Sequence, residues 1–190
     1  MECNKYKRIK KELAYKAHIF DVYNDYLVLP DGREVVYDLI DHVDGACILP
    51  ITDDGRVYLV KQYRNTLDRL TYEVPAGCME PGESPEECAV RETREETGLV
   101  PGKRIFITKT ILAVGTSNEQ TYIYLGTKLE KTDRHMDENE FIDVCLFDME
   151  QVDRMIRRGE IVDSKTLIAI YAYRAIGEDG KRLSIKQQSK

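Results

Sequence analysis

The sequence predicts an α+β fold, in which β-strands pack against two or three helices. Two turn signals, Asp31-Gly32 and Asp54-Gly55, separate short stretches that are rich in β-branched and aromatic residues. Three later segments carry helix start signals or helical apolar spacing, beginning near Ser84, near Asp148, and at Asp163 or Ser164. The 190 residues suffice for one domain with a small extension.

The extension is a strand-rich N-terminal lobe, which we assign to residues 1–45. Strands are expected at 15–22, 26–30 and 34–39, whereas the basic run from Lys5 to Lys11 suggests a solvated arm. Such a unit is too small to bury its own apolar side. It must therefore pack on the main domain or on a second subunit, and we expect a homodimer.

The main domain is assigned to residues 46–190 and should contain most of the sheet. Its expected strands are 45–51, 57–62, 71–74, 104–114, 120–126 and 141–147. Residues 128–140 are polar and acidic without an apolar period, and long loops inside compact domains are often functional. The last helix should bury Leu167, Ile168, Ile170, Tyr171 and Ala175, and the helix from Asp148 should bury Met149, Val152, Met155 and Ile156.

The stretch from Gly77 to Leu99 carries the strongest local signal. Ser84 with Glu87 forms an S-x-x-E capping box, Pro85 suits the first helical position, and Gly98 suits the helix end. Between these ends, Glu92, Glu95 and Glu96 fall on one arc of the helix. Three carboxylates on one arc repel each other, unless a hard cation such as Mg²⁺ neutralises them.

Composition excludes several other classes of function. The net charge of −6 argues against a general nucleic-acid surface. No apolar run is long enough to span a membrane and no apolar signal region follows Met1, so we expect neither membrane insertion nor secretion. Five cysteines without a CxxC pair favour free thiols in the cytoplasm, and three scattered histidines disfavour a zinc site.

The spacing of the acidic helix resembles the Nudix box, G-x5-E-x7-R-E-U-x-E-E-x-G-U. Gly77, Glu83, Arg91-Glu92, Glu95-Glu96 and Gly98-Leu99 match it, and only Thr93 departs from the usual aliphatic residue. The resemblance implies a Nudix α/β/α sandwich with the small antiparallel β lobe at its N-terminus. It also implies a hydrolase that uses Mg²⁺ or Mn²⁺ to cleave nucleoside diphosphates linked to another moiety.

Position by position, the resemblance implies a metal site and a brace. Glu92 and Glu96 would be the main ligands, Glu95 a third or water-mediated ligand, and the Ala76 carbonyl would complete the set. Arg91 would pair with a carboxylate of the box and hold its loop.

Segments outside the box resemble the ADP-ribose pyrophosphatase branch of the family, as in Tyr72 to Gly77 and Asp163 to Leu167. In that branch the N-terminal strands form a dimerising lobe. Arg64 would contact a phosphate or the second sugar, Glu73 would lie beside the metals, and Glu119 would bind substrate. Val114 stands where the branch usually has a proline associated with ADP-ribose, so the exact nucleotide sugar stays open.

The catalytic base is expected in the acidic loop. Hydrolysis at phosphorus needs a water activated by metal and by a carboxylate. Glu140, just before the strand at Phe141, best matches the placement of the base in this branch, with Glu138 and Glu95 as rivals.

These observations predict a pyrophosphatase that converts a nucleoside diphosphate sugar, first of all ADP-ribose, into AMP and ribose 5-phosphate. The alternatives are hydrolysis of another nucleotide sugar such as GDP-mannose, and a catalytically silent domain that senses nucleotides. The intact acidic set argues against silence, because a sensor needs no full set of metal ligands.

Overall fold

The computed structural model describes residues 5–134 and 141–176. The chain divides into two compact units. The first contains the described residues up to Asp44 together with Ile111–Gln120, and the second contains Gly45–Thr110 and the described residues from Thr121 onward. Each unit is described by itself.

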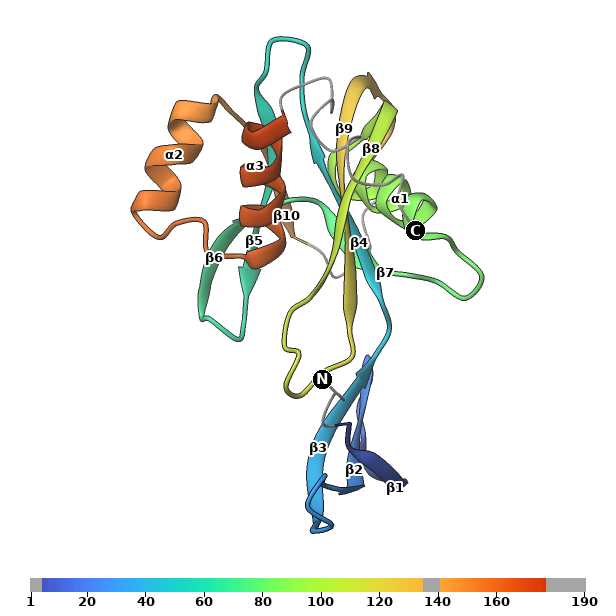
Figure 1. The fold of residues 1–190 in the computed structure, drawn as a ribbon. Coiled ribbons are helices and arrows are strands. Elements are labelled where there is room, and N and C mark those ends of the chain that lie inside the picture. Colours follow the sequence, from blue (N-terminus) through green and yellow to red (C-terminus); the bar gives the residue numbers. More distant parts are fainter. Residues whose placement is uncertain (1–4, 135–140, 177–190) are drawn as a thin grey trace. The chain divides into compact units, whose positions relative to one another are not determined.

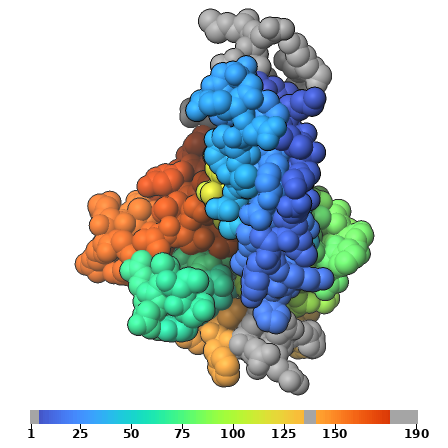
Figure 2. Space-filling model, turned by 90° about the horizontal axis from the view of Figure 1, so that it is seen from below, coloured from blue at the N-terminus to red at the C-terminus, as the bar shows by residue number. Residues whose placement is uncertain are grey.

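The first unit is an antiparallel sheet of three strands, β1 (Lys7–Lys16), β2 (Phe20–Val28) and β3 (Glu34–His42), in the order β1-β2-β3. Its surface is blue in Figure 2. The predicted turn at Asp31-Gly32 joins β2 to β3, with Gly32 at a φ of +88°. Segment 111–120 joins this unit because the amide of Ile40 donates to the carbonyl of Thr116 at 2.7 Å.

The basic run near the N-terminus is exposed, as predicted, but most of it forms strand β1 instead of a free arm. Two of its charges pair with acidic residues of β2 and β3. Arg8 donates to both oxygens of Asp25 at 2.6 and 2.7 Å, and Lys11 pairs with Asp41. The ammonium of Lys11 also lies 3.9 Å from the ring centroid of Tyr23. Such cross-strand pairs of opposite charge stabilise β1 as a strand although it carries many charges.

The second unit has two sheets (Figure 1). One has the order β7-β4-β9-β8, formed by β4 (Gly45–Pro50), β7 (Ala76–Cys78), β8 (Leu99–Ile111) and β9 (Gln120–Lys131). The other has the order β10-β5-β6, formed by β5 (Val57–Arg64), β6 (Arg69–Glu73) and β10 (Ile142–Phe147). Strand β4 runs parallel to β9 and antiparallel to β7.

Strand β4 lies at the centre of the second unit, and all six of its residues are buried. Alternate side chains point to opposite faces. Ala46 and Ile48 pack with Cys88 and Ala89 of helix α1 (Pro85–Thr97). The other face belongs to the larger core, to which helix α2 (Met149–Arg157) and helix α3 (Ser164–Ile176) contribute.

The second unit is therefore an α/β/α sandwich, with α1 on one side of the four-stranded sheet and α2 and α3 on the other (Figure 1). Helix α2 buries the predicted face: Val152 and Met155 are buried, and Met149 and Ile156 pack against the core. The predicted face of α3 is partly wrong. Its buried residues are Thr166, Ala169, Ile170, Tyr173 and Ile176, whereas Tyr171 is exposed.

Within the described residues, no helix is long and apolar enough to cross a membrane.

Candidate active site

Helix α1 begins and ends as the sequence predicts. The Ser84 hydroxyl accepts from the Glu87 amide at 3.3 Å, and the Glu87 carboxylate accepts from the Ser84 amide at 2.9 Å, which completes the capping box. Gly98 ends the helix in the left-handed conformation, with a φ of +69°. These caps set the two ends of α1.

One arginine braces the acidic row on α1. Arg91 donates to both oxygens of Glu83 at 2.8 and 3.0 Å. Its Nη1 also donates to Glu92 at 2.7 Å and to Glu95 at 3.1 Å, and its Nη2 donates to the carbonyl of Cys78. A single guanidinium thus holds three carboxylates and the loop that precedes the helix.

The ion pair between Arg91 and Glu83 favours the charged forms of both groups. The hydrogen bonds from Arg91 lower the pKa of Glu83 to about 2. Pairing with Glu83, and then with Glu92 and Glu95, raises the pKa of Arg91 above its ordinary value. The Glu83 carboxylate is therefore charged at neutral pH.

Two members of the predicted metal set, Glu96 and Glu92, lie against strand β7. Glu96 is only 3% exposed, and its Oε2 accepts from the amide of Ala76 at 3.1 Å. The carboxylate of Glu92 lies so close to Gly77 that a β-carbon at position 77 would be 2.0 Å from Oε1. The acidic arc of α1 therefore meets the backbone of Ala76 and Gly77.

The residues in this region fit a hard divalent cation by their chemistry. Carboxylate and carbonyl oxygens are the donors that Mg²⁺ prefers. In the described part of the chain, no three acidic, cysteine or histidine side chains converge on one point as a ready-made metal site. Arg91 also donates to oxygens of Glu92 and Glu95, and its positive charge offsets part of the repulsion within the acidic row.

A second charged cluster surrounds Glu73 at the end of β6. Arg64 donates to both oxygens of Glu73, at 2.7 Å from Nε and 2.6 Å from Nη2. Lys165 donates to Oε2 at 2.8 Å and the Thr71 hydroxyl donates to Oε1 at 2.7 Å. A carboxylate has about four lone-pair sites. These four hydrogen bonds therefore use the acceptor capacity of Glu73.

This cluster is ionised although it is largely buried. Burial alone would raise the pKa of Glu73, but the hydrogen bonds from Arg64 and the charge of Lys165 lower it to about 2. Burial likewise opposes the charge of Lys165, but Asp163 and Glu73 raise its pKa overall. Arg64 keeps 41% of its side chain exposed, so it can still meet a ligand.

The first turn of α3 supports the same stretch of backbone. The Asp163 carboxylate caps α3 by accepting from the amide of Thr166 at 3.0 Å. The Thr166 hydroxyl donates to Asp163 at 2.5 Å and accepts from the amide of Val74 at 2.8 Å. Helix α3 therefore touches Glu73 through Lys165 and Val74 through Thr166.

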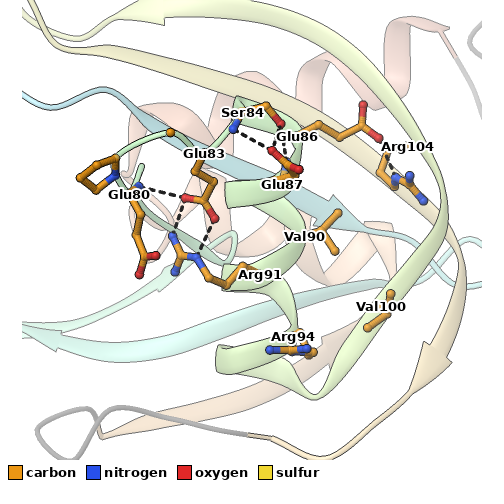
Figure 3. A pocket seen from close by; sticks show the side chains of 12 residues that line it. Glu80, Glu83, Ser84, Glu86, Glu87, Val90, Arg91, Arg94, Val100 and Arg104 are labelled. Carbon is orange, nitrogen blue, oxygen red and sulfur yellow. Dashed lines mark hydrogen bonds and ion pairs between the residues drawn. The ribbon is translucent and has the colours of Figure 1, made fainter.

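A groove of about 830 Å³ lies beside α1. Figure 3 shows loop residues such as Glu80 and Glu83, the helix residues Val90 and Arg94, and Val100 of β8 around it. Arg91 and Glu83 point toward each other at its edge. The arginine that braces the acidic row therefore also lines this groove.

The remaining predicted site residues belong to the first unit or lie outside the described residues. Glu119 belongs to the first unit, where its amide donates to the Ser117 hydroxyl at 3.2 Å. Val114, in the same segment, is 82% exposed. Glu138 and Glu140, the candidate bases, lie outside the described residues.

Sequence reasoning missed the roles of Lys165 and Thr166. The sequence predicts a helix start at Asp163 or Ser164 and a resemblance to a Nudix branch over Asp163 to Leu167, but neither assigns a role to these two residues. The cap at Thr166 had a local signal, because Asp163 stands three residues before it, whereas nothing near Lys165 in the sequence points to Glu73, 92 residues away.

Comparison with known proteins agrees with this geometry. A family model described as the NUDIX domain matches residues 41–168. An ADP-ribose pyrophosphatase of Bacillus subtilis (strain 168) is 34% identical over 166 residues, which cover 86% of this chain and 90% of that protein. An ADP-ribose pyrophosphatase of Mycobacterium tuberculosis (strain ATCC 25618 / H37Rv) is 30% identical over 174 residues, or 90% and 84% of the two chains.

A solved structure described as an ADP compounds hydrolase has the same fold, with a TM-score of 0.82 at 20% identity, covering 92% of this chain and 95% of that one. The chain belongs to the Nudix family. Within it, the chain is a Nudix hydrolase that acts on phosphoric anhydrides, and it is similar to ADP-ribose pyrophosphatases over most of its length.

Proposed function

We propose that this enzyme is a metal-dependent pyrophosphatase of nucleoside diphosphate sugars, and that ADP-ribose, cleaved to AMP and ribose 5-phosphate, is its substrate. The observation that carries the proposal is the row Glu92, Glu95 and Glu96, braced by Arg91 against the backbone of β7. The similarity to two ADP-ribose pyrophosphatases supports the choice of substrate.

The same row defines how the chain would hold Mg²⁺ or Mn²⁺. Glu92 and Glu96 would be the main ligands, with Glu95 and the Ala76 carbonyl completing the set. When bound, the ion supplies positive charge that stabilises the phosphate oxygens and favours deprotonation of the attacking water.

Arg64 would bind the substrate, and Glu73 would orient Arg64. Two of the five guanidinium donors point to Glu73, which leaves others available for a phosphate or sugar oxygen. Because Glu73 already accepts four hydrogen bonds, its part in substrate binding would act through Arg64. Glu119 remains a proposed contact from the first unit.

Hydrolysis also needs a base. The water oxygen adds to one phosphorus, the anhydride P–O bond breaks, and the water proton passes to a carboxylate. We assign that carboxylate to Glu140, which lies outside the described residues, with Glu138 and Glu95 as alternatives.

A coupled phosphate-release assay tests this proposal. The purified full chain is incubated with ADP-ribose, GDP-mannose and other nucleotide sugars, with Mg²⁺ or Mn²⁺ and a phosphatase that acts only on the monoester products. We expect phosphate release from ADP-ribose that requires the metal and is lost in Glu96→Gln. Binding of ADP-ribose without turnover would instead indicate a nucleotide sensor.

One observation favours a second substrate. Val114 replaces the proline associated with ADP-ribose, and its side chain is 82% exposed in the first unit. A change at that position can alter which nucleotide sugar is accepted. Faster turnover of GDP-mannose than of ADP-ribose in the same assay would select this alternative.

We also propose a homodimer that works in the cytoplasm. Strand β1 is exposed along its whole length and presents Ile9, Leu13 and Tyr15 to solvent, which supports coverage by a second copy. Among the described cysteines, Cys47, Cys88 and Cys145 are free thiols, in keeping with a reducing compartment.

A further inference from the structure

The backbone from Glu73 to Gly77 connects the two charged clusters of the site. At its start, Glu73 holds Arg64. At its end, the Ala76 amide holds Glu96, and Gly77 lies against Glu92. An element that fixes the position of this short stretch can therefore influence the positions of both Arg64 and the acidic row.

Helix α3 contacts this stretch at two adjacent residues through two different side chains. Lys165 bonds the carboxylate of Glu73 at 2.8 Å, and Thr166 accepts from the amide of Val74 at 2.8 Å. Thr166 is completely buried, and the Lys165 side chain is 14% exposed. Neither side chain is therefore placed to meet a substrate in solvent; each acts on backbone or on another side chain.

We propose that Lys165 and Thr166 are positioning residues of the hydrolase, acting on substrate binding and on metal binding respectively. Lys165 acts through Glu73 on Arg64, and Thr166 acts through Val74 on the Ala76 backbone that meets Glu96. This inference rests on the proposed function, its substrate arm on the proposed substrate and its metal arm on the proposed metal site.

The Lys165 arm follows from charge. Two cations, Arg64 and Lys165, balance two anions, Glu73 and Asp163, in one largely buried cluster. Without Lys165 the cluster carries a net negative charge, and Glu73 holds Arg64 without competition. Both effects disfavour an anionic diphosphate at Arg64.

The Thr166 arm follows from hydrogen bonding. The buried Val74 amide has the Thr166 hydroxyl as its acceptor, and a buried amide that loses its acceptor shifts the chain toward another one. Ala76 lies two residues further on. A shift there changes how its amide and carbonyl meet Glu96, and therefore how well the acidic row binds a cation.

The test uses the full chain, with Lys165→Met, Thr166→Val and Thr166→Ser. Mn²⁺ binding is measured without substrate by electron paramagnetic resonance, and KM and kcat for ADP-ribose are measured at saturating metal. Arg174→Met is the matched control, because Arg174 is a cation at the other end of the same helix, paired with Asp153. Thermal melts verify folding, and Thr166→Ala replaces Thr166→Val if the valine does not fit.

We expect Thr166→Val to weaken Mn²⁺ binding about tenfold, the lower end of the range for outer partners of metal ligands. Thr166→Ser, which keeps the hydroxyl, should restore it. Lys165→Met should raise KM about tenfold with a smaller effect on kcat, and leave Mn²⁺ affinity within about threefold. Arg174→Met should match the wild type in both measurements.

The opposite pattern overturns the inference. Wild-type Mn²⁺ affinity in the folded Thr166→Val variant refutes the metal arm, and an unchanged KM in folded Lys165→Met refutes the substrate arm. If the wild type hydrolyses none of the nucleotide sugars, the proposed function fails, while the Mn²⁺ titration still decides the role of Thr166.

Discussion

The carboxylate of Glu92 occupies the space that a side chain at Gly77 would need. A β-carbon at position 77 would lie 2.0 Å from Oε1 and 2.2 Å from Cδ of Glu92. The glycine at the start of the box is therefore required by close approach rather than by a special backbone angle. The clash would be with the end of a long side chain, which can move while the backbone stays in place.

Gly77→Ala should consequently fold but lose function. The Glu92 carboxylate should be displaced, and a misplacement of about 1 Å costs on the order of 10²-fold in rate. Turnover and Mn²⁺ affinity should fall while the melting temperature changes little. Gly115→Ala, where the added carbon meets nothing within 4 Å, is the control for melting and Mn²⁺ affinity. Full Mn²⁺ affinity in Gly77→Ala would contradict this account.

Glu96→Gln should remove most of the activity and keep the fold. A glutamine oxygen can still accept from the Ala76 amide, while the charge needed for a metal ligand is lost. Loss of one charge from the row also relieves repulsion, so urea unfolding without metal should show equal or greater stability. Near wild-type turnover at saturating Mg²⁺ would be inconsistent with the assigned role.

Glu140→Gln should lower kcat far more than it raises KM. A general base acts in the transition state and contributes about 10²–10⁴-fold. Mn²⁺ affinity should survive, because the proposed ligands lie on α1 and β7. Glu138→Gln is the control and should lose less. A loss under about tenfold in Glu140→Gln, or a greater loss in Glu138→Gln, would move the assignment to Glu138 or Glu95.

Acid should destabilise the protein in part through Glu73. Its pKa of about 2 in the folded protein lies below the ordinary value of 4.5. Its ionisation therefore stabilises the fold above the ordinary pKa, and this contribution is lost as the pH falls from about 5 toward 2. Glu83, also with a pKa of about 2, acts in the same direction.

Urea unfolding across this pH range checks the assignment. Glu73→Gln should be destabilised at pH 7 by about 3–5 kcal/mol, because two cations lose a buried partner, and should show a shallower loss in acid. Glu150→Gln, which alters a side chain that is 90% exposed, should keep the wild-type curve. If the Glu73→Gln and wild-type curves run parallel, Glu73 does not carry this dependence.

The proposed dimer has a direct measurement. Light scattering at micromolar concentration should give about twice the chain mass of 22.0 kDa. Leu13→Glu on exposed β1 should shift the mass toward one chain, whereas Val162→Glu on the second unit should not. A monomeric wild type would rule the dimer out.

Most of the second unit could be predicted because its signals are local. The capping box at Ser84, the helix end at Gly98 and the cap at Asp148 depend on residues within one or two turns, and all three are confirmed. The spacing of the three box glutamates likewise placed them on one helical arc. Local geometry of this kind can be read directly from residue order.

What could not be predicted depends on residues far apart in the chain. The run from Lys5 suggested an arm because its partners, Asp25 and Asp41, are distant in the sequence. The hydrogen bond between Lys165 and Glu73 joins residues that are 92 positions apart, so no local sequence pattern predicts it. The four hydrogen bonds that Glu73 accepts are therefore visible only in the folded structure.

The hydrogen bonds of Arg91 have a consequence for how the enzyme would acquire the proposed metal. Because the guanidinium already provides positive charge inside the acidic row, we expect α1 to stay folded when no ion is bound. A chelator should then switch the enzyme off without unfolding it, unlike a zinc finger. The metal concentration would then control the activity reversibly. The protein would stay folded when the ion dissociates, so a new ion could bind without refolding.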